Sequence, residues 1–142
     1  MKDQHLTHDR RLIEWLGVIA CSGALALVQW ILNKDSVDQL EYRILVKHIL
    51  IDLACFSVAL LIVSRFILER FIRSSAMALL GAVSASLLVD VPFFYRDIPN
   101  WSGNTAGWLM HAISFVFLNG IIALLVMLLI YGAGIIVTAD TD

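Results

Sequence analysis

Long apolar runs separated by short polar breaks are the dominant pattern along this chain. Four of these runs reach the roughly 20 mostly apolar residues that a helix needs to cross a bilayer. We place the spans at about residues 12–32, 44–63, 76–95 and 113–136. The pattern predicts an all-α integral membrane bundle of four transmembrane helices, formed as a single domain over residues 1–142.

The fourth run is longer than one span requires. Residues 106–139 as a single helix would measure roughly 50 Å, against a hydrocarbon core of about 30 Å. The helix can tilt or protrude, it can break at Asn119 and Gly120, or residues 106–112 can form a short interfacial helix before the span. We favour the interfacial helix at 106–112, with the span starting at 113.

The stretch between the second and third runs mixes arginines with large apolar residues. Arg65, Arg70 and Arg73 alternate there with phenylalanine, isoleucine and leucine. Such a segment lies at the lipid headgroups, where it buries its apolar side and exposes its charges. Ser74 and Ser75 then offer a tight turn into the third helix.

Composition supports the membrane assignment. Hydrophobic residues make up 60% of the chain and charged residues 15%, with a mean hydropathy of +0.85. Soluble domains contain about 45–50% apolar and about 25% charged residues. Ten Lys and Arg against twelve Asp and Glu leave no basic surplus, which excludes a nucleic-acid-binding protein.

Basic residues near the span ends predict the orientation, because they accumulate on the cytoplasmic side. With the N-terminus inside, the inner side holds six of them and the outer side four. The inner six are Lys2, Arg10, Arg11, Arg65, Arg70 and Arg73, and the outer four are Lys34, Arg43, Lys47 and Arg96. We therefore predict an up-down-up-down, multi-pass protein of the cell inner (plasma) membrane with N- and C-termini inside.

Ionisable residues inside the spans are the candidate functional residues, because they are costly in hydrocarbon. Asp52, Asp90 and His111 all fall in the outer half of the bilayer, and His48 precedes Asp52 by one helical turn. Brought together, they would form a polar cluster that binds a cation, relays protons or holds a lipid headgroup. The alternative is a set of structural ion pairs, such as Asp52 with His111 or Asp90 with Arg96.

The two histidines allow a further interpretation. His48 and His111 lie at similar depth on different helices, so they could ligate a b-type haem from opposite sides. A single intramembrane histidine is more often a hydrogen-bonded core residue. We expect no metal site and no cofactor, and keep the haem pair as an alternative.

Glu14 is a third acidic residue within the apolar pattern, near the inner surface. It follows Arg10 by one helical turn, which favours a local ion pair between side chains that reach toward the headgroups. Arg65 at the inner end of the second helix is the alternative partner.

Small residues recur on one face of the third span, which allows another backbone to approach closely. The repeat consists of Ser74, Ala78, Ala82, Ser86 and Asp90. A similar set, Gly17, Cys21 and Ala24, continues from Glu14 in the first span. We expect these faces to contact neighbouring helices, either within the chain or in a second copy.

Catalytic signatures are absent from the sequence, which favours a non-enzymatic protein. We expect a small membrane protein, homo-oligomeric or an accessory subunit, that conducts or transports a small solute or ion. Its partners would be the lipid bilayer and other membrane subunits. The alternatives are an outer-leaflet membrane enzyme or haem/redox subunit, and a holin-like pore-forming effector.

Overall fold

The computed structural model describes residues 2–33, 42–90 and 105–139, and the side chains at 12–31, 45–89, 107, 109–110 and 112–133. Its elements are α1 (Lys2–Asn33), α2 (Tyr42–Phe66), α3 (Arg70–Ala85), the π-helical turn η1 (Ser86–Asp90) that continues α3, and α5 (Thr105–Ala139). Apart from residues 67–69, the described part of the chain is helical.

Four helices are long and apolar enough to cross a membrane. These spans are Leu12–Ile31, Leu45–Phe66, Arg70–Val89 and Ala112–Ala133. The bilayer core offers no water to hydrogen-bond the backbone, so a helix that satisfies its own N–H and C=O groups is the stable form of such segments. The predicted all-α bundle with four membrane-spanning helices is confirmed at this level.

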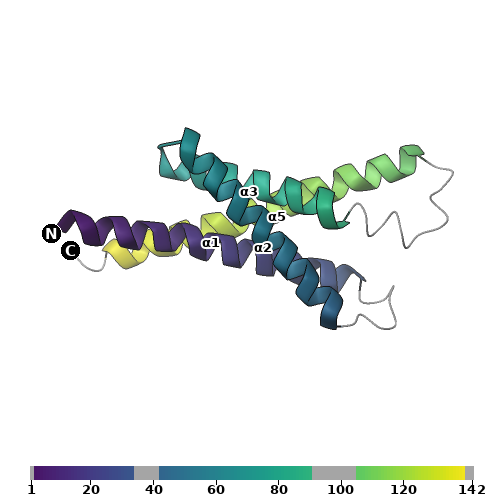
Figure 1. The fold of residues 1–142 in the computed structure, drawn as a ribbon, viewed down its shortest axis with the longest axis horizontal. Coiled ribbons are helices and arrows are strands. Elements are labelled where there is room, and N and C mark those ends of the chain that lie inside the picture. The colour runs from purple at the N-terminus through teal and green to yellow at the C-terminus, as the bar shows by residue number, and fades with distance from the viewer. Residues whose placement is uncertain (1, 34–41, 91–104, 140–142) are drawn as a thin grey trace.

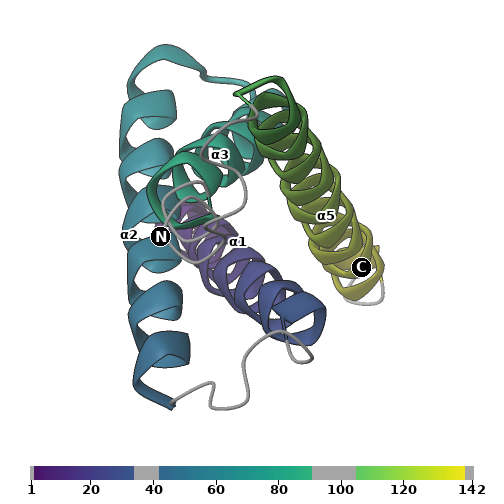
Figure 2. The same ribbon diagram turned by 90° about the vertical axis from the view of Figure 1, so that its right-hand side faces the viewer.

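The helices pack in a cycle (Figures 1 and 2). α2 contacts α1 on one side and α3 on the other, and α5 closes the cycle by contacting both α1 and α3. The start of α1 and the end of α5 lie at the same end of the molecule. Toward the opposite end, the α1–α2 pair and the η1–α5 pair diverge from each other.

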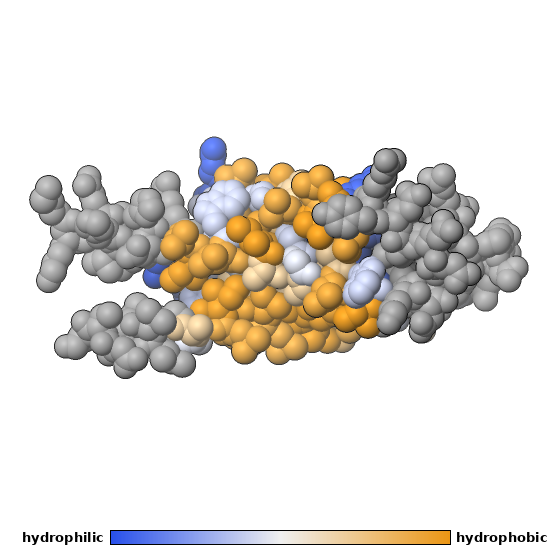
Figure 3. All heavy atoms as spheres, turned by 90° about the horizontal axis from the view of Figure 1, so that it is seen from below, coloured by the Kyte–Doolittle hydropathy of each residue, from blue (hydrophilic) through white to orange (hydrophobic). Residues whose placement is uncertain are grey.

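Large apolar side chains cover the outside of the bundle. Leu61 is 59% exposed and Leu129 is 73% exposed, as are many similar residues on all four helices. On the face that Figure 3 shows, hydrophobic residues dominate the middle of the molecule and hydrophilic residues lie toward both of its ends. An apolar belt of this kind is stable when lipid surrounds it and would cause aggregation in water.

The predicted small-residue face of α3 is buried inside the bundle. Ser74, Ala78, Ala82 and Ser86 are each at most 1% exposed. Gly81 lies beside this face and directly under the ring of Phe56 on α2: a Cβ added at Gly81 would lie 2.6 Å from the Phe56 Cε1 atom. The absence of a side chain there lets α2 and α3 approach closely.

Two predicted boundaries are corrected. The turn between the second and third helices lies at residues 67–69, and Ser74 and Ser75 lie within α3. The backbone N–H of Arg73 already donates to Glu69 O at 2.9 Å, so the helix starts before the serines. Residues 106–112 do not form a helix of their own, because α5 runs unbroken from Thr105 to Ala139, while the apolar span within α5 starts at Ala112.

The continuity of α5 has a simple cause. The segment contains no proline, and within a membrane a continuous helix satisfies its own backbone N–H and C=O groups. Asn119 and Gly120 do not break the helix either, and both are buried against neighbouring helices.

Candidate functional site

Asp52 is a carboxylate enclosed by the helix bundle. It lies in the apolar span of α2, and its side chain is 0% exposed. Phe56 and Ala59, one and two turns later, are also buried, so Asp52 belongs to the face of α2 that points into the bundle rather than to lipid.

Each of the other helices also buries a polar side chain in the same half of its span. Gln29 of α1, Ser86 of η1 and Asn119 of α5 are at most 4% exposed. All three, like Asp52, lie in the half of their spans farther from the start of α1 and the end of α5. We call Gln29, Asp52, Ser86 and Asn119 the polar layer.

A direct hydrogen bond links two members of the polar layer. The side-chain amide of Asn119 donates from Nδ2 to Ser86 Oγ at 2.8 Å, joining α5 to η1. Ser86 is the first residue of the π-helical turn, and such turns occur frequently at functional sites. The layer therefore combines carboxylate, amide and hydroxyl groups in an interior that is mostly apolar.

Two of the four members of the polar layer, Gln29 and Asn119, were not predicted from the sequence as inward-facing polar residues. Gln29 follows Val18, Ser22 and Leu25 at helical spacing, and all four are buried, so this periodicity could have identified it. Asn119 was considered only as a possible helix break. Its position inside a strongly apolar run was itself a signal of an inward-facing polar group.

The predicted partners of Asp52 are placed only in part. His48 lies one turn before Asp52 on α2 and is half-buried. Asp90 is the last residue of η1, and His111 lies in α5 eight residues before Asn119, but both side chains fall outside the described ones. The Asp52–Asp90–His111 cluster and the His48–His111 haem pair therefore remain predictions.

The π-helical turn η1 also interrupts the predicted four-residue repeat of small residues that runs from Ser74 to Asp90. Hydrogen bonds in a π-helix run from residue i to i+5, so each turn is wider than in an α-helix. A four-residue repeat therefore no longer fixes the face of a residue beyond Ser86. Ser86 itself still lies on the buried face.

Glu14 pairs with an arginine of α3. Arg73 donates from Nε to Glu14 Oε1 at 2.8 Å and donates to the same oxygen from Nη2. The Arg73 Nη1 atom also lies 3.5 Å from the carbonyl oxygen of Ile67 in the α2–α3 turn. Arg73 was not among the predicted partners of Glu14: Arg65, the alternative partner, is exposed on α2, and the side chain of Arg10, the favoured partner, lies outside the described ones.

A second contact lies beside this ion pair. Ser74 Oγ and the hydroxyl of Tyr131 on α5 are 3.0 Å apart, and the Tyr131 ring packs edge-on against Phe71 with centroids 6.0 Å apart. Arg73 and Ser74 are adjacent in sequence, yet they bind α1 and α5 respectively. The first turn of α3 thus ties three helices together at this end of the bundle.

Neither cysteine forms a disulfide, and both are buried. Cys21 lies with Sγ 3.6 Å from the carbonyl oxygen of Ala123, so it serves the contact between α1 and α5. Among the described residues, no group of three or more His, Cys, Asp or Glu side chains is placed to hold a metal ion.

Comparison of the whole chain with protein-family models, with curated proteins and with solved structures finds no match. The function therefore has to be inferred from the arrangement of the side chains. The buried polar layer around the interior of an apolar bundle is the feature that carries most chemical information.

Proposed function

We propose that this protein is a multi-pass membrane protein that conducts or transports a small cation, with the proton included, through a site at Asp52. The single observation that carries the proposal is the complete enclosure of the Asp52 carboxylate within the apolar span of α2. Intramembrane carboxylates that face a bundle interior commonly mark ion pathways and proton relays.

The energetic cost of Asp52 supports a functional role. An aspartate at the centre of a membrane helix costs about 2.5–3.5 kcal/mol on insertion scales. An apolar residue would pack at this position without that cost. Hard cations prefer oxygen ligands, and the Asp52 carboxylate supplies two of them inside the bundle.

The packing of the rest of the core supports a homo-oligomer as the active form. Outside the polar layer, the bundle interior is filled by Val18, Leu25, Met77 and other fully buried side chains. A small four-helix bundle packed in this way leaves little room for a solute path along its own axis. We infer that copies of the chain assemble so that their contacts provide the remainder of the path.

We further propose an up-down-up-down path through the cell inner membrane with both termini inside. The start of α1 and the end of α5 lie at one end of the bundle, and the α2–α3 turn lies at that end too. Arg65, Arg70 and Arg73 flank this turn. Positive charge at one end of the spans favours that end as the cytoplasmic one.

The test uses the purified full-length chain in liposomes that hold a pH-sensitive or a potassium-sensitive dye. We expect Asp52→Asn to lower the proton or potassium flux at least tenfold, since it removes the charge while keeping the shape. The midpoint of thermal unfolding in detergent should stay equal or rise, because the cost of an intramembrane charge is removed.

Glu69→Gln is the matched control. Glu69 is exposed in the α2–α3 turn, and its change removes the same charge outside the spans. We expect both flux and thermal midpoint to be unchanged. The proposal is wrong if the parent protein gives no flux above empty liposomes, or if Asp52→Asn lowers the thermal midpoint and leaves flux intact.

A further inference from the structure

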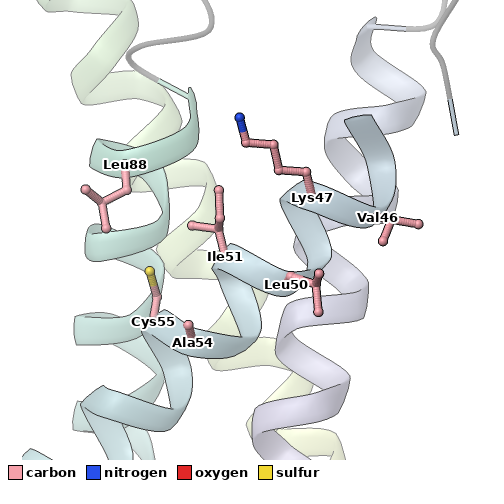
Figure 4. Close-up of a pocket in the computed structure, with 7 residues that line it drawn as sticks. All are labelled: Val46, Lys47, Leu50, Ile51, Ala54, Cys55 and Leu88. Carbon is pink, nitrogen blue, oxygen red and sulfur yellow. The ribbon is translucent and has the colours of Figure 1, made fainter. Parts of the chain in front are cut away.

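A groove on the outside of the bundle separates the first half of α2 from η1 (Figure 4). It has a volume of about 560 Å³. Its α2 wall is formed by Val46, Leu50, Ile51, Ala54 and Cys55, and its other wall by Leu88 of η1. It lies where the α1–α2 pair diverges from the η1–α5 pair.

A second hollow continues the groove along the same helices. It has a volume of about 300 Å³ and shares Ala54, Cys55 and Leu88 with the first. From there it extends past Ile62 of α2 and Leu80 of α3. The two hollows therefore form one continuous groove on the lipid-facing surface, lined by apolar side chains apart from Ser84 in the second hollow and one lysine in the first.

One charged residue stands at the mouth of this groove. Lys47 is exposed, and it extends from α2 across the open end toward the η1 side. It is the third residue of the span Leu45–Phe66, which places its ammonium at the level of the lipid headgroups. A positive charge thus lies at headgroup level directly above a purely apolar groove wall.

We propose that this groove binds an anionic phospholipid, with its phosphate at Lys47 and an acyl chain along α2 and η1. From Lys47 to Cys55, α2 rises about 12 Å at 1.5 Å per residue. One leaflet contributes about 15 Å of hydrocarbon. The first hollow, from Lys47 to Cys55, therefore matches the depth of a lipid from a single leaflet. This site is separate from the buried polar layer and does not depend on transport.

The charge favours a lipid over a helix from a second copy. A second apolar helix could cover the groove, but it would offer no counter-charge to the Lys47 ammonium at headgroup level. An anionic headgroup instead supplies the counter-charge at the depth where Lys47 lies. The exposed small side chain of Ala54 leaves room for an acyl chain against the helix backbone.

The experiment titrates the detergent-purified full-length chain with dioleoyl phosphatidylglycerol or with dioleoyl phosphatidylcholine, and follows the thermal midpoint. We expect a saturable rise with phosphatidylglycerol, at an affinity at least tenfold higher than for phosphatidylcholine. Lys47→Gln should lower the affinity for phosphatidylglycerol roughly tenfold, which is the effect of losing one charge-assisted hydrogen bond. Lys47→Arg should retain that affinity.

Two further variants test the groove itself. Ala54→Phe fills the groove from an exposed position and should lower the affinity for phosphatidylglycerol. Arg65→Gln removes an exposed cation from the other end of α2 and should leave that affinity unchanged. If Ala54→Phe alters the lipid-free midpoint, the comparison of Lys47→Gln with Lys47→Arg still decides the outcome.

Several results would overturn the proposal. Equal affinity for the two lipids, or full affinity in Lys47→Gln, would show that the headgroup is not recognised at Lys47. Stabilisation by inorganic phosphate alone would indicate a site for a free anion. A dimer that Ala54→Phe dissociates, with phosphatidylglycerol affinity unchanged, would make the groove an interface between two copies.

Discussion

Glu14 and Asp52 are both withdrawn from solvent, and their surroundings give them different roles. Glu14 accepts two hydrogen bonds from the Arg73 guanidinium near the end of its span, so its charge is neutralised by a partner on another helix. Asp52 lies deeper, in the polar layer of the bundle interior. The first arrangement stabilises the contact between α1 and α3, and the second is the one we connect to function.

The Glu14–Arg73 pair predicts a coupled effect on stability. Glu14→Gln and Arg73→Met should each lower the free energy of unfolding by about 1–3 kcal/mol, because each leaves a poorly solvated group without its ionic partner. The double variant should lose less than the sum of the two single losses. Thermal or denaturant unfolding in detergent, measured as a double-mutant cycle, gives the coupling energy.

The exposure of the two side chains makes this prediction specific. The Arg73 side chain is 18% exposed and the Glu14 side chain is 12% exposed, so solvent screens the pair only partly. A matched cycle between Glu14→Gln and Arg65→Met should show no coupling, since Arg65 is exposed on α2. Strict additivity in the Glu14–Arg73 cycle would contradict the contact.

At the scale of elements, α3 holds the bundle together. Like α1, it contacts each of the other three long helices, and its small residues let those helices come close. Its first turn bonds α1 through Arg73 and α5 through Ser74. Its continuation η1 bonds α5 again through Ser86. Both ends of α3 are thus fixed by hydrogen bonds, while its middle is fixed by close packing.

The close packing in the middle of α3 predicts a strong effect at Gly81. Gly81→Ala should lower stability by about 1–3 kcal/mol, because the added methyl group would overlap the rigid ring of Phe56. The same change at Gly23, where nothing lies within 4 Å of the added atom, should leave stability equal or raise it by about 0.5–1 kcal/mol.

The midpoint of thermal unfolding in detergent compares these two glycine variants directly. Phe56→Leu combined with Gly81→Ala should recover part of the loss, since a smaller side chain gives the methyl group room. Equal midpoints for Gly81→Ala and Gly23→Ala would show that α2 and α3 do not meet at this position.

At the scale of the whole molecule, the bundle has two chemically different ends. The end with the α2–α3 turn carries arginines and the Glu14–Arg73 pair. The half toward the opposite end contains the polar layer and the groove below Lys47. This asymmetry gives the proposed orientation a functional meaning, because the enclosed Asp52 and the lipid groove would both lie in the outer half of the membrane.

The orientation is tested with a reporter that is active only in the cytoplasm. Fused after Asp142 it should be active, and inserted after Gly103 it should be silent, because an even number of spans returns the chain to its starting side. The reverse pattern would invert the orientation. Activity at both positions would contradict four membrane crossings.

Features that depend on residues within one helix could be predicted from the sequence, whereas features that depend on contacts between helices could not. The four spans and the buried repeat Ser74, Ala78, Ala82 and Ser86 could be predicted, since both depend on residue types within one helix. The turn at residues 67–69 was misplaced, because the serines that favour turns also hydrogen-bond readily between helices, as Ser74 does with Tyr131. Local signals therefore located the spans better than their connections.

The candidate site also combines features that one segment determines with features that depend on the packing of several helices. The inward orientation of Asp52 follows from the cost of a charge facing lipid, so the sequence could indicate it. The contribution of Asn119 and its bond to Ser86 depends on how α5 is rotated against η1, which no single segment determines. Likewise, the choice of Arg73 for Glu14 follows from which helix lies beside α1 at that depth.

The sequence by itself determined that the chain forms four apolar helices, because the length of a hydrophobic run and the need to satisfy the backbone in lipid are properties of each segment alone. Only the tertiary structure decided the cyclic order of the helices, the partner of Glu14, the contact of Phe56 with Gly81 and the groove below Lys47. Each of these depends on the rotation and crossing of helices far apart in the chain, and those are set by the fit of side chains from several helices at once.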